Sequence, residues 1–132
     1  MQDRPTVNEL LEAVTHFLDD EVVPNLTGSR QFYSRVAANV LRTIMRELDV
    51  EEAQLIAEWE RLDSLLPREL QPPTRVELKQ AIRRRTEELC QRIRHGDADT
   101  GPYRKQVLIH VCESVREKLL VSNPGWIQRP AS

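Results

Sequence analysis

The sequence predicts an all-α protein, a single-domain bundle of about five helices that spans residues 1–132. Apolar residues recur every three or four positions over five segments, which is the period of helices packed along one face. Most of these segments are separated by turns that contain proline or glycine. No segment shows the alternation of apolar and polar residues that indicates a strand. A chain of 132 residues is long enough to bury one core without disulfides or metal.

The first two helices are predicted over residues 7–22 and 29–48. Thr6 and Glu9 have the spacing of a capping box before the first, and a turn that contains Pro24 separates the two. Each helix carries one apolar face, which we expect to lie in the core. The expected core positions are Leu11, Val14, Phe17, Val36 and Val40.

Three further helices are predicted over residues 51–66, 75–94 and 103–121. Asp49 and Glu52 are expected to cap the start of the third helix, and Pro67 is expected to stop it. Thr74 and Glu77 repeat the capping-box spacing before the fourth, and Gly96 follows its end. Leu62 and Val111 are the expected core positions in this part of the chain.

Charge is nearly balanced overall but unevenly distributed. The formal net charge is −2, so composition does not mark a nucleic-acid-binding protein. Residues 1–74 hold 7 arginines against 14 acidic residues, a net of −7, and residues 75–132 hold 12 basic against 7 acidic residues, a net of +5. The favoured interpretation is that the two halves attract each other inside one fold. The alternative is a basic C-terminal surface for an anionic ligand or partner.

The sequence favours a cytoplasmic protein. No stretch approaches the roughly 20 apolar residues that span a bilayer, and the N-terminus lacks the basic and apolar regions of a secretory signal. Cys90 and Cys112 fall on the apolar sides of their predicted helices, so we expect them to be unpaired and buried.

The sequence contains no candidate catalytic residue, metal site or cofactor site. No glycine-rich phosphate-binding loop is present, and His16, His95 and His110 do not form a metal-binding motif. His110 lies on the polar side of its predicted helix and is expected to be solvated. Paired carboxylates such as Glu51-Glu52 are interpreted as charged helix surface.

The best candidates for binding a partner or an anion lie on the second helix. Arg35, Asn39, Arg42 and Arg46 fall together away from the predicted core face. The arginine guanidinium suits carboxylate and phosphate groups. Asparagine is a poor helix former, so its position within a helix indicates a role other than helix formation. Solvent exposure with local ion pairs explains Arg42 and Arg46 better, whereas both interpretations stay open for Arg35 and Asn39.

Two further segments are candidates. The run Arg83-Arg84-Arg85 is a weak nucleic-acid signal because consecutive helical residues point about 100° apart. Asn123 and Trp126 follow the last helix, and Trp126 is either a lid on the end of the bundle or an anchor at an interface. The lid is favoured, and the last residues, 127–132, are expected to fray.

Several segments of the N-terminal third form a recognisable pattern. They are Arg4-Pro5-Thr6-x-x-Glu9-Leu10-Leu11, Leu26-x-Gly28, Arg35-Val36-Ala37-Ala38-Asn39-x-Leu41 and Arg46-Glu47-Leu48. With these segments the N-terminal third resembles the DUF6285 family of small bacterial helical proteins. The C-terminal residues Lys118-Leu119 and Asn123-Pro124 also fit the family.

The resemblance implies a partner. Family members of this kind accompany a kinase of the aminoglycoside-phosphotransferase type, and one branch resembles the small accessory subunit of a 4-hydroxyacyl-CoA kinase. The expected function is therefore that of a non-catalytic accessory subunit in hydroxy-acid and acyl-CoA catabolism, with a CoA-thioester substrate handled by the complex. The alternative is a stand-alone helical binding or regulatory module that binds nucleic acid through the basic C-terminal half.

Overall fold

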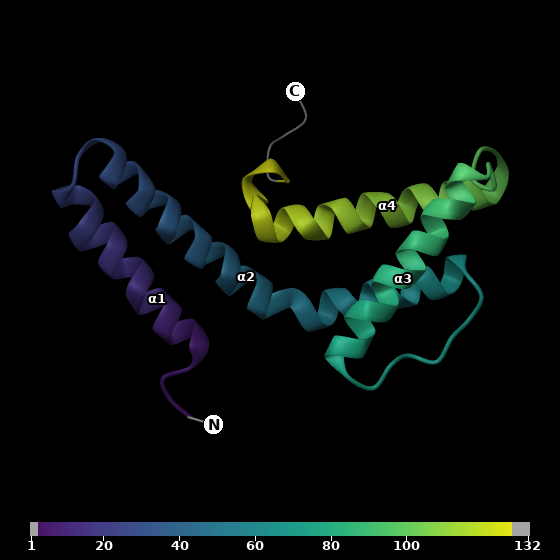
Figure 1. Ribbon diagram of the computed structural model, residues 1–132, viewed down its shortest axis with the longest axis horizontal. Helices are drawn as coiled ribbons and strands as arrows, with labels where there is room; N and C mark the ends of the chain where they lie inside the picture. Colours follow the sequence, from purple (N-terminus) through teal and green to yellow (C-terminus); the bar gives the residue numbers. More distant parts are fainter. Residues whose placement is uncertain (1–2, 128–132) are drawn as a thin grey trace. The chain divides into compact units, whose positions relative to one another are not determined.

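A computed structural model describes residues 3–127 and confirms the all-helical class. No strand occurs in the described residues, and four α-helices are present rather than about five (Figure 1). They are α1 (Val7–Phe17), α2 (Gly28–Leu65), α3 (Arg75–Arg94) and α4 (Gly101–Ser122). Shorter segments are the π-helical η1 (Leu18–Val22) and the 3₁₀-helical η2 (Val23–Asn25) and η3 (Pro124–Trp126). Residues 128–132 of the segment predicted to fray lie outside the described part of the chain.

The second and third predicted helices are one helix. α2 continues through Asp49 and Val50, where the sequence analysis placed a break. No proline or glycine interrupts the backbone there, so nothing removes a helical hydrogen bond. Asp49 does not act as a cap, because its carboxylate accepts a hydrogen bond from the side-chain amide of Asn8 at 2.5 Å.

The local helix signals are confirmed elsewhere. Thr6 and Glu9 form the reciprocal capping box of α1, and the Thr74 hydroxyl accepts a hydrogen bond from the Glu77 amide at the start of α3. Gly96 follows α3 with φ +88°, a conformation that residues with a Cβ rarely adopt. None of the helices that the structure describes is long and apolar enough to cross a membrane.

The chain divides into two compact units, Met1–Asp49 and Val50–Ser132. The first is a hairpin in which α1 runs antiparallel to the N-terminal half of α2 (Figure 1). Thr15 and Ala38 are buried along the contact between the helices. The Gln31 side chain donates to the Val23 carbonyl at 3.0 Å, and Arg42 forms an ion pair with Asp19.

The predicted core of the hairpin is wrong. Phe17 is 58% exposed, and Val14, Val36 and Val40 are also exposed. The helices meet along small and polar positions beside this apolar face. Ala38 permits close approach of the two backbones. The buried Thr15 hydroxyl is satisfied within α1, because it donates to the Leu11 carbonyl. The periodicity correctly located the apolar face of each helix. It did not locate the surface through which α1 and α2 contact each other.

The core lies in the second unit. Leu62 is fully buried, as predicted, and Tyr103 of α4 donates from its hydroxyl to the Leu65 carbonyl at 3.2 Å. The core combines side chains from α2, the following loop, α3 and α4. It consists of Trp59, Leu62, Leu65, Leu66, Leu78, Ile82, Leu89 and Val107.

The expected core position of α4, Val111, is wrong. Val107, His110 and Val121 are buried, whereas Val111 is exposed. The expectation that both cysteines are buried is also wrong: both thiols are free, but Cys112 is exposed and Cys90 is only half-buried. α4 is apolar over more than half of its circumference, so its periodicity did not define a single buried face.

Candidate interaction surface

Arg35 and Asn39 lie one helical turn apart on an exposed part of α2. Phe32 lies beside them, 62% exposed, and packs edge-on against Tyr33 with ring centroids 5.6 Å apart. These residues are turned about 90° from the line where α2 contacts α1, on the side away from the apolar face. The predicted pair is therefore presented to solvent on the hairpin, next to an aromatic ring.

The other two arginines of the predicted stripe have structural contacts. Arg42 pairs with Asp19 across the hairpin, and the Arg46 guanidinium donates to the Thr43 hydroxyl at 3.1 Å. Arg42 therefore joins α2 to η1 by an ion pair, and its role as a candidate for binding a partner stays a prediction. The local ion pair expected for Arg42 is present, whereas the contact between Arg46 and Thr43 is a hydrogen bond to a neutral hydroxyl.

Trp126 is not a lid. It lies in η3 and is 60% exposed, so it does not seal the end of a helical bundle. Asn123 is also exposed, and its carbonyl accepts the Trp126 amide at 3.1 Å. This turn presents the indole outward, as the interface-anchor interpretation requires.

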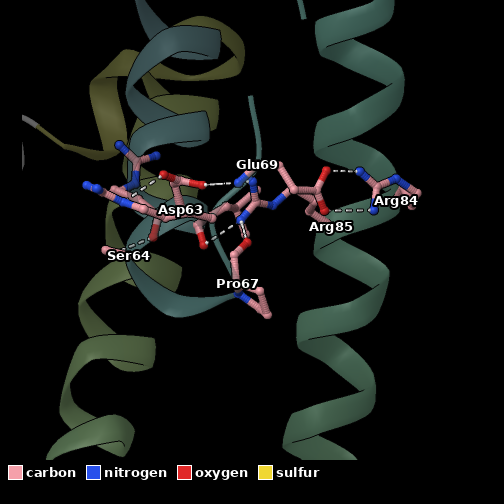
Figure 2. Close-up of polar contacts among 9 residues, drawn as sticks. Asp63, Ser64, Pro67, Glu69, Arg84 and Arg85 are labelled. Atoms are coloured by element: carbon pink, nitrogen blue, oxygen red, sulfur yellow. Dashed lines mark hydrogen bonds and ion pairs between the residues drawn. The ribbon is translucent and has the colours of Figure 1, made fainter. Parts of the chain in front are cut away.

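Arg85 is a buried cation that the sequence analysis did not identify. Its side chain is fully buried in the second unit, with its guanidinium carbon 4.6 Å from the centre of the Trp59 ring. The guanidinium donates to Asp63 at 3.0 Å, and to the carbonyls of Leu62 at 3.3 Å and Pro67 at 2.9 Å (Figure 2). A cation-π contact together with charge-assisted hydrogen bonds explains how this charge is tolerated inside the core.

The same network fixes the loop between α2 and α3. Asp63 accepts the Glu69 amide at 3.1 Å, and the Glu69 carboxylate forms a bidentate pair with Arg84 (Figure 2). The Glu69 amide and the Arg85 guanidinium lower the pKa of Asp63, and Arg84 lowers the pKa of Glu69. Arg84 and Arg85 thus form ion pairs with Glu69 and Asp63 that stabilise the fold. The arginine run therefore does not form one exposed basic patch.

A signal for Arg85 was present in the sequence. Leu78, Ile82, Arg85 and Leu89 follow the i, i+4, i+7, i+11 spacing of the face of α3 that enters the core. An arginine on such a face requires a buried acceptor. The periodicity could not identify Asp63 and the loop carbonyls as those acceptors.

A second polar cluster joins α2 to α4. Arg61 forms a bidentate pair with Glu117, with nitrogen–oxygen distances of 2.9 and 2.6 Å. His110 is 6% exposed, so the expectation of a solvated histidine is wrong. Its Nδ1 is one of the buried side-chain atoms without a hydrogen-bond partner within the described residues.

A family model supplies the identification. The model for a domain of unknown function, DUF6285, matches residues 24–126, more than three quarters of the chain. The chain belongs to the DUF6285 family. No curated protein sequence and no solved structure matches it. The DUF6285 match covers α2, α3, α4 and η3, whereas the Arg4–Leu11 segment of the sequence resemblance lies before it.

The described part of this DUF6285 chain contains no group of three or more His, Cys, Asp or Glu side chains placed to hold a metal ion. One of the two adjacent carboxylates considered for acid–base work forms ion pairs. Glu51 pairs with Arg75 at 3.3 Å and with Lys79.

The buried histidine of this DUF6285 protein is expected to make its stability depend on pH. Burial and the charge of Arg61, followed by that of Lys118, lower the pKa of His110, whereas Glu117 opposes them. Above about pH 6.5 the side chain is neutral in both the folded and unfolded states. As the pH falls below this value the unfolded chain binds the proton first, so the free energy of unfolding decreases.

The measurement compares chemical unfolding of the wild type and His110→Leu between pH 7.5 and 5. We expect the variant to become progressively more stable relative to the wild type below about pH 6.5, by at most about 1.4 kcal/mol per pH unit. His16→Leu at an exposed position is the control. A stability difference between the wild type and His110→Leu that is constant over this range would contradict the prediction.

Proposed function

We propose that this chain is a non-catalytic accessory subunit of an aminoglycoside-phosphotransferase-like kinase that acts on hydroxyacyl-CoA. The observation that carries the proposal is the exposed cluster of Phe32, Arg35 and Asn39 on α2. An aromatic ring, an arginine fork and an amide on adjacent helical turns form a compact surface that can anchor a protein partner.

The chemistry of this cluster suits an acidic site on the kinase. An arginine can donate two parallel hydrogen bonds to a carboxylate or phosphate, and Asn39 is close enough along the helix to contact the same group. Phe32 supplies apolar area that excludes water from these bonds. Trp126 provides a second anchor for a partner.

The sequence is compatible with a complex in which the kinase, and not this chain, binds ATP. With only 4 glycines and no phosphate-binding loop, the chain offers no recognised site for ATP, and we assign it no cofactor. The kinase partner would supply the nucleotide site. The resemblance to the family implies the class of the kinase and of its substrate. We also propose a cytoplasmic location.

The test is co-expression of the tagged chain with the aminoglycoside-phosphotransferase-like kinase of the same organism. We expect a stable complex and hydroxyacyl-CoA-dependent ATP consumption that neither chain alone matches. Arg35→Ala should weaken the complex by about 1.5–3 kcal/mol, roughly 10- to 150-fold. Arg30→Ala on the same helix is the matched control.

Thermal melting separates a binding role from a structural one. Arg35→Ala is expected to melt close to the wild type, because Arg35 is exposed. If the variant melts much earlier while its folded fraction binds the kinase normally, the Arg35–Asn39 assignment fails. Salt-dependent binding to DNA with no binding to the kinase would favour the alternative module.

A further inference from the structure

A cavity of about 170 Å³ lies between α2 and α4, entirely within the second unit. It combines polar side chains from both helices with apolar walls from Leu65 and Ile109. The residues that line it are Arg61, Ser64, Leu65, Gln106, Ile109 and His110. A cavity of about 150 Å³ holds a benzene molecule, so this one has room for roughly six non-hydrogen atoms.

Buried polar atoms without a partner are concentrated at this contact between α2 and α4. Four buried side-chain nitrogen or oxygen atoms of the described residues lack a hydrogen-bond partner, and three of them belong to Arg61, His110 and Ser114. His110 is more than nine-tenths buried and lines the cavity itself. Buried polar atoms in proteins are nearly always hydrogen-bonded, so several exceptions at one place indicate a site for a further hydrogen-bonding group.

The polar groups of the cavity are rich in hydrogen-bond donors. Guanidinium nitrogens can only donate, and Nε of Arg61 has no acceptor although the two terminal nitrogens donate to Glu117. The side-chain amide of Gln106 offers two N–H groups, and the neutral imidazole of His110 offers one. A ligand with acceptor oxygens complements these donors.

The charges that act on His110 are positive on balance. Arg61 and Lys118 are the cations near it, and the carboxylate of Glu117 opposes them. Glu58 interacts with Arg61, Glu117 and Lys118 rather than with His110. A negatively charged group beside the imidazole is therefore favoured.

We propose that this cavity binds a small organic acid. Its carboxylate lies among Arg61, Gln106 and His110, and its short aliphatic chain lies against Leu65 and Ile109. Butyrate, with four carbons and two oxygens, matches the size of the cavity. The site needs no partner chain, so failure to bind the kinase would count only against the accessory-subunit function.

The test titrates sodium butyrate into the purified full chain at constant ionic strength and follows the histidine ring signals by NMR. We expect the His110 signals to shift and to saturate with a Kd of about 1 mM or below, which six non-hydrogen atoms can supply. His16 and His95 are exposed and lie outside the cavity, so their signals are internal controls. No shift of His110 well above this concentration, or equal shifts of all three histidines, would overturn the proposal.

Butyramide distinguishes a carboxylate site from a purely apolar one. It keeps the aliphatic chain and the carbonyl oxygen but carries no charge, so it should bind at least about tenfold more weakly than butyrate. Equal affinities would show that the cavity holds the chain without recognising the carboxylate, and the assigned ligand class would be wrong.

The pKa of His110 reports where the carboxylate lies. A bound anion beside the ring favours the charged imidazolium, so saturating butyrate should raise this pKa relative to the free protein. The measurement is a pH titration of the His110 ring signals with and without butyrate. An unchanged pKa would contradict the placement of the carboxylate at the imidazole.

Two tryptophan substitutions on α4 test the location of the site. Ile109→Trp adds bulk at a wall of the cavity and should abolish butyrate binding, whereas Leu108→Trp lies at the adjacent position outside the cavity and should leave it unchanged. Both side chains are more than half exposed, so neither substitution overpacks the core. Arg61 and His110 stay intact in this comparison, because both belong to the contact between α2 and α4. Undiminished binding by folded Ile109→Trp would place the ligand elsewhere and overturn the proposal.

Discussion

Replacing Arg85 with alanine is expected to lower the free energy of unfolding by about 3–5 kcal/mol. The substitution removes a fully buried side chain from the face of Trp59. It also leaves Asp63 and the carbonyls of Leu62 and Pro67 without their guanidinium donor. The loop that follows α2 would lose the hydrogen bond that joins its Pro67 carbonyl to Arg85 of α3.

Chemical unfolding monitored by circular dichroism measures this effect. Arg83→Ala is the control, because Arg83 lies on the same helix and is exposed, and a change within about 0.5 kcal/mol is expected. The loop of Arg85→Ala should also be cleaved faster by protease under native conditions. Equal unfolding free energies for the two variants would show that Arg85 does not hold the loop.

The second large effect is expected at Leu62. This side chain is fully buried in the core of the second unit, so Leu62→Ala should cost about 2–5 kcal/mol through lost burial and a residual cavity. Leu70 provides a comparison in the same chain. It is 96% exposed in the loop after α2, and Leu70→Ala should change stability by no more than about 0.5 kcal/mol.

The leucine pair is best measured by thermal and chemical unfolding under identical conditions. The two substitutions remove the same atoms, so any difference between them reports on burial. A Leu70→Ala variant as destabilised as Leu62→Ala would mean that the loop leucine is covered in solution. Activity measurements are not needed for this comparison.

The residues of the predicted surface on α2 differ in their surroundings. Arg35 and Asn39 lie on an exposed face, whereas Arg42 forms an ion pair with Asp19 within the hairpin. Ion pairing between residues far apart in the sequence cannot be read from helical spacing. For the same reason Arg85 and Trp59, which contact each other across α3 and α2, were missed as a pair.

By itself the sequence determined the helical class, the N-caps of α1 at Thr6 and of α3 at Thr74, and the glycine, Gly96, that follows the end of α3. These features depend on backbone groups within three or four residues, so local chemistry specifies them. The tertiary structure decided which side of each helix is buried. α4 turns His110 inward and Val111 outward, and the hairpin leaves Phe17 exposed. Burial depends on the surface that a neighbouring helix offers, and an apolar period along one helix does not contain that information.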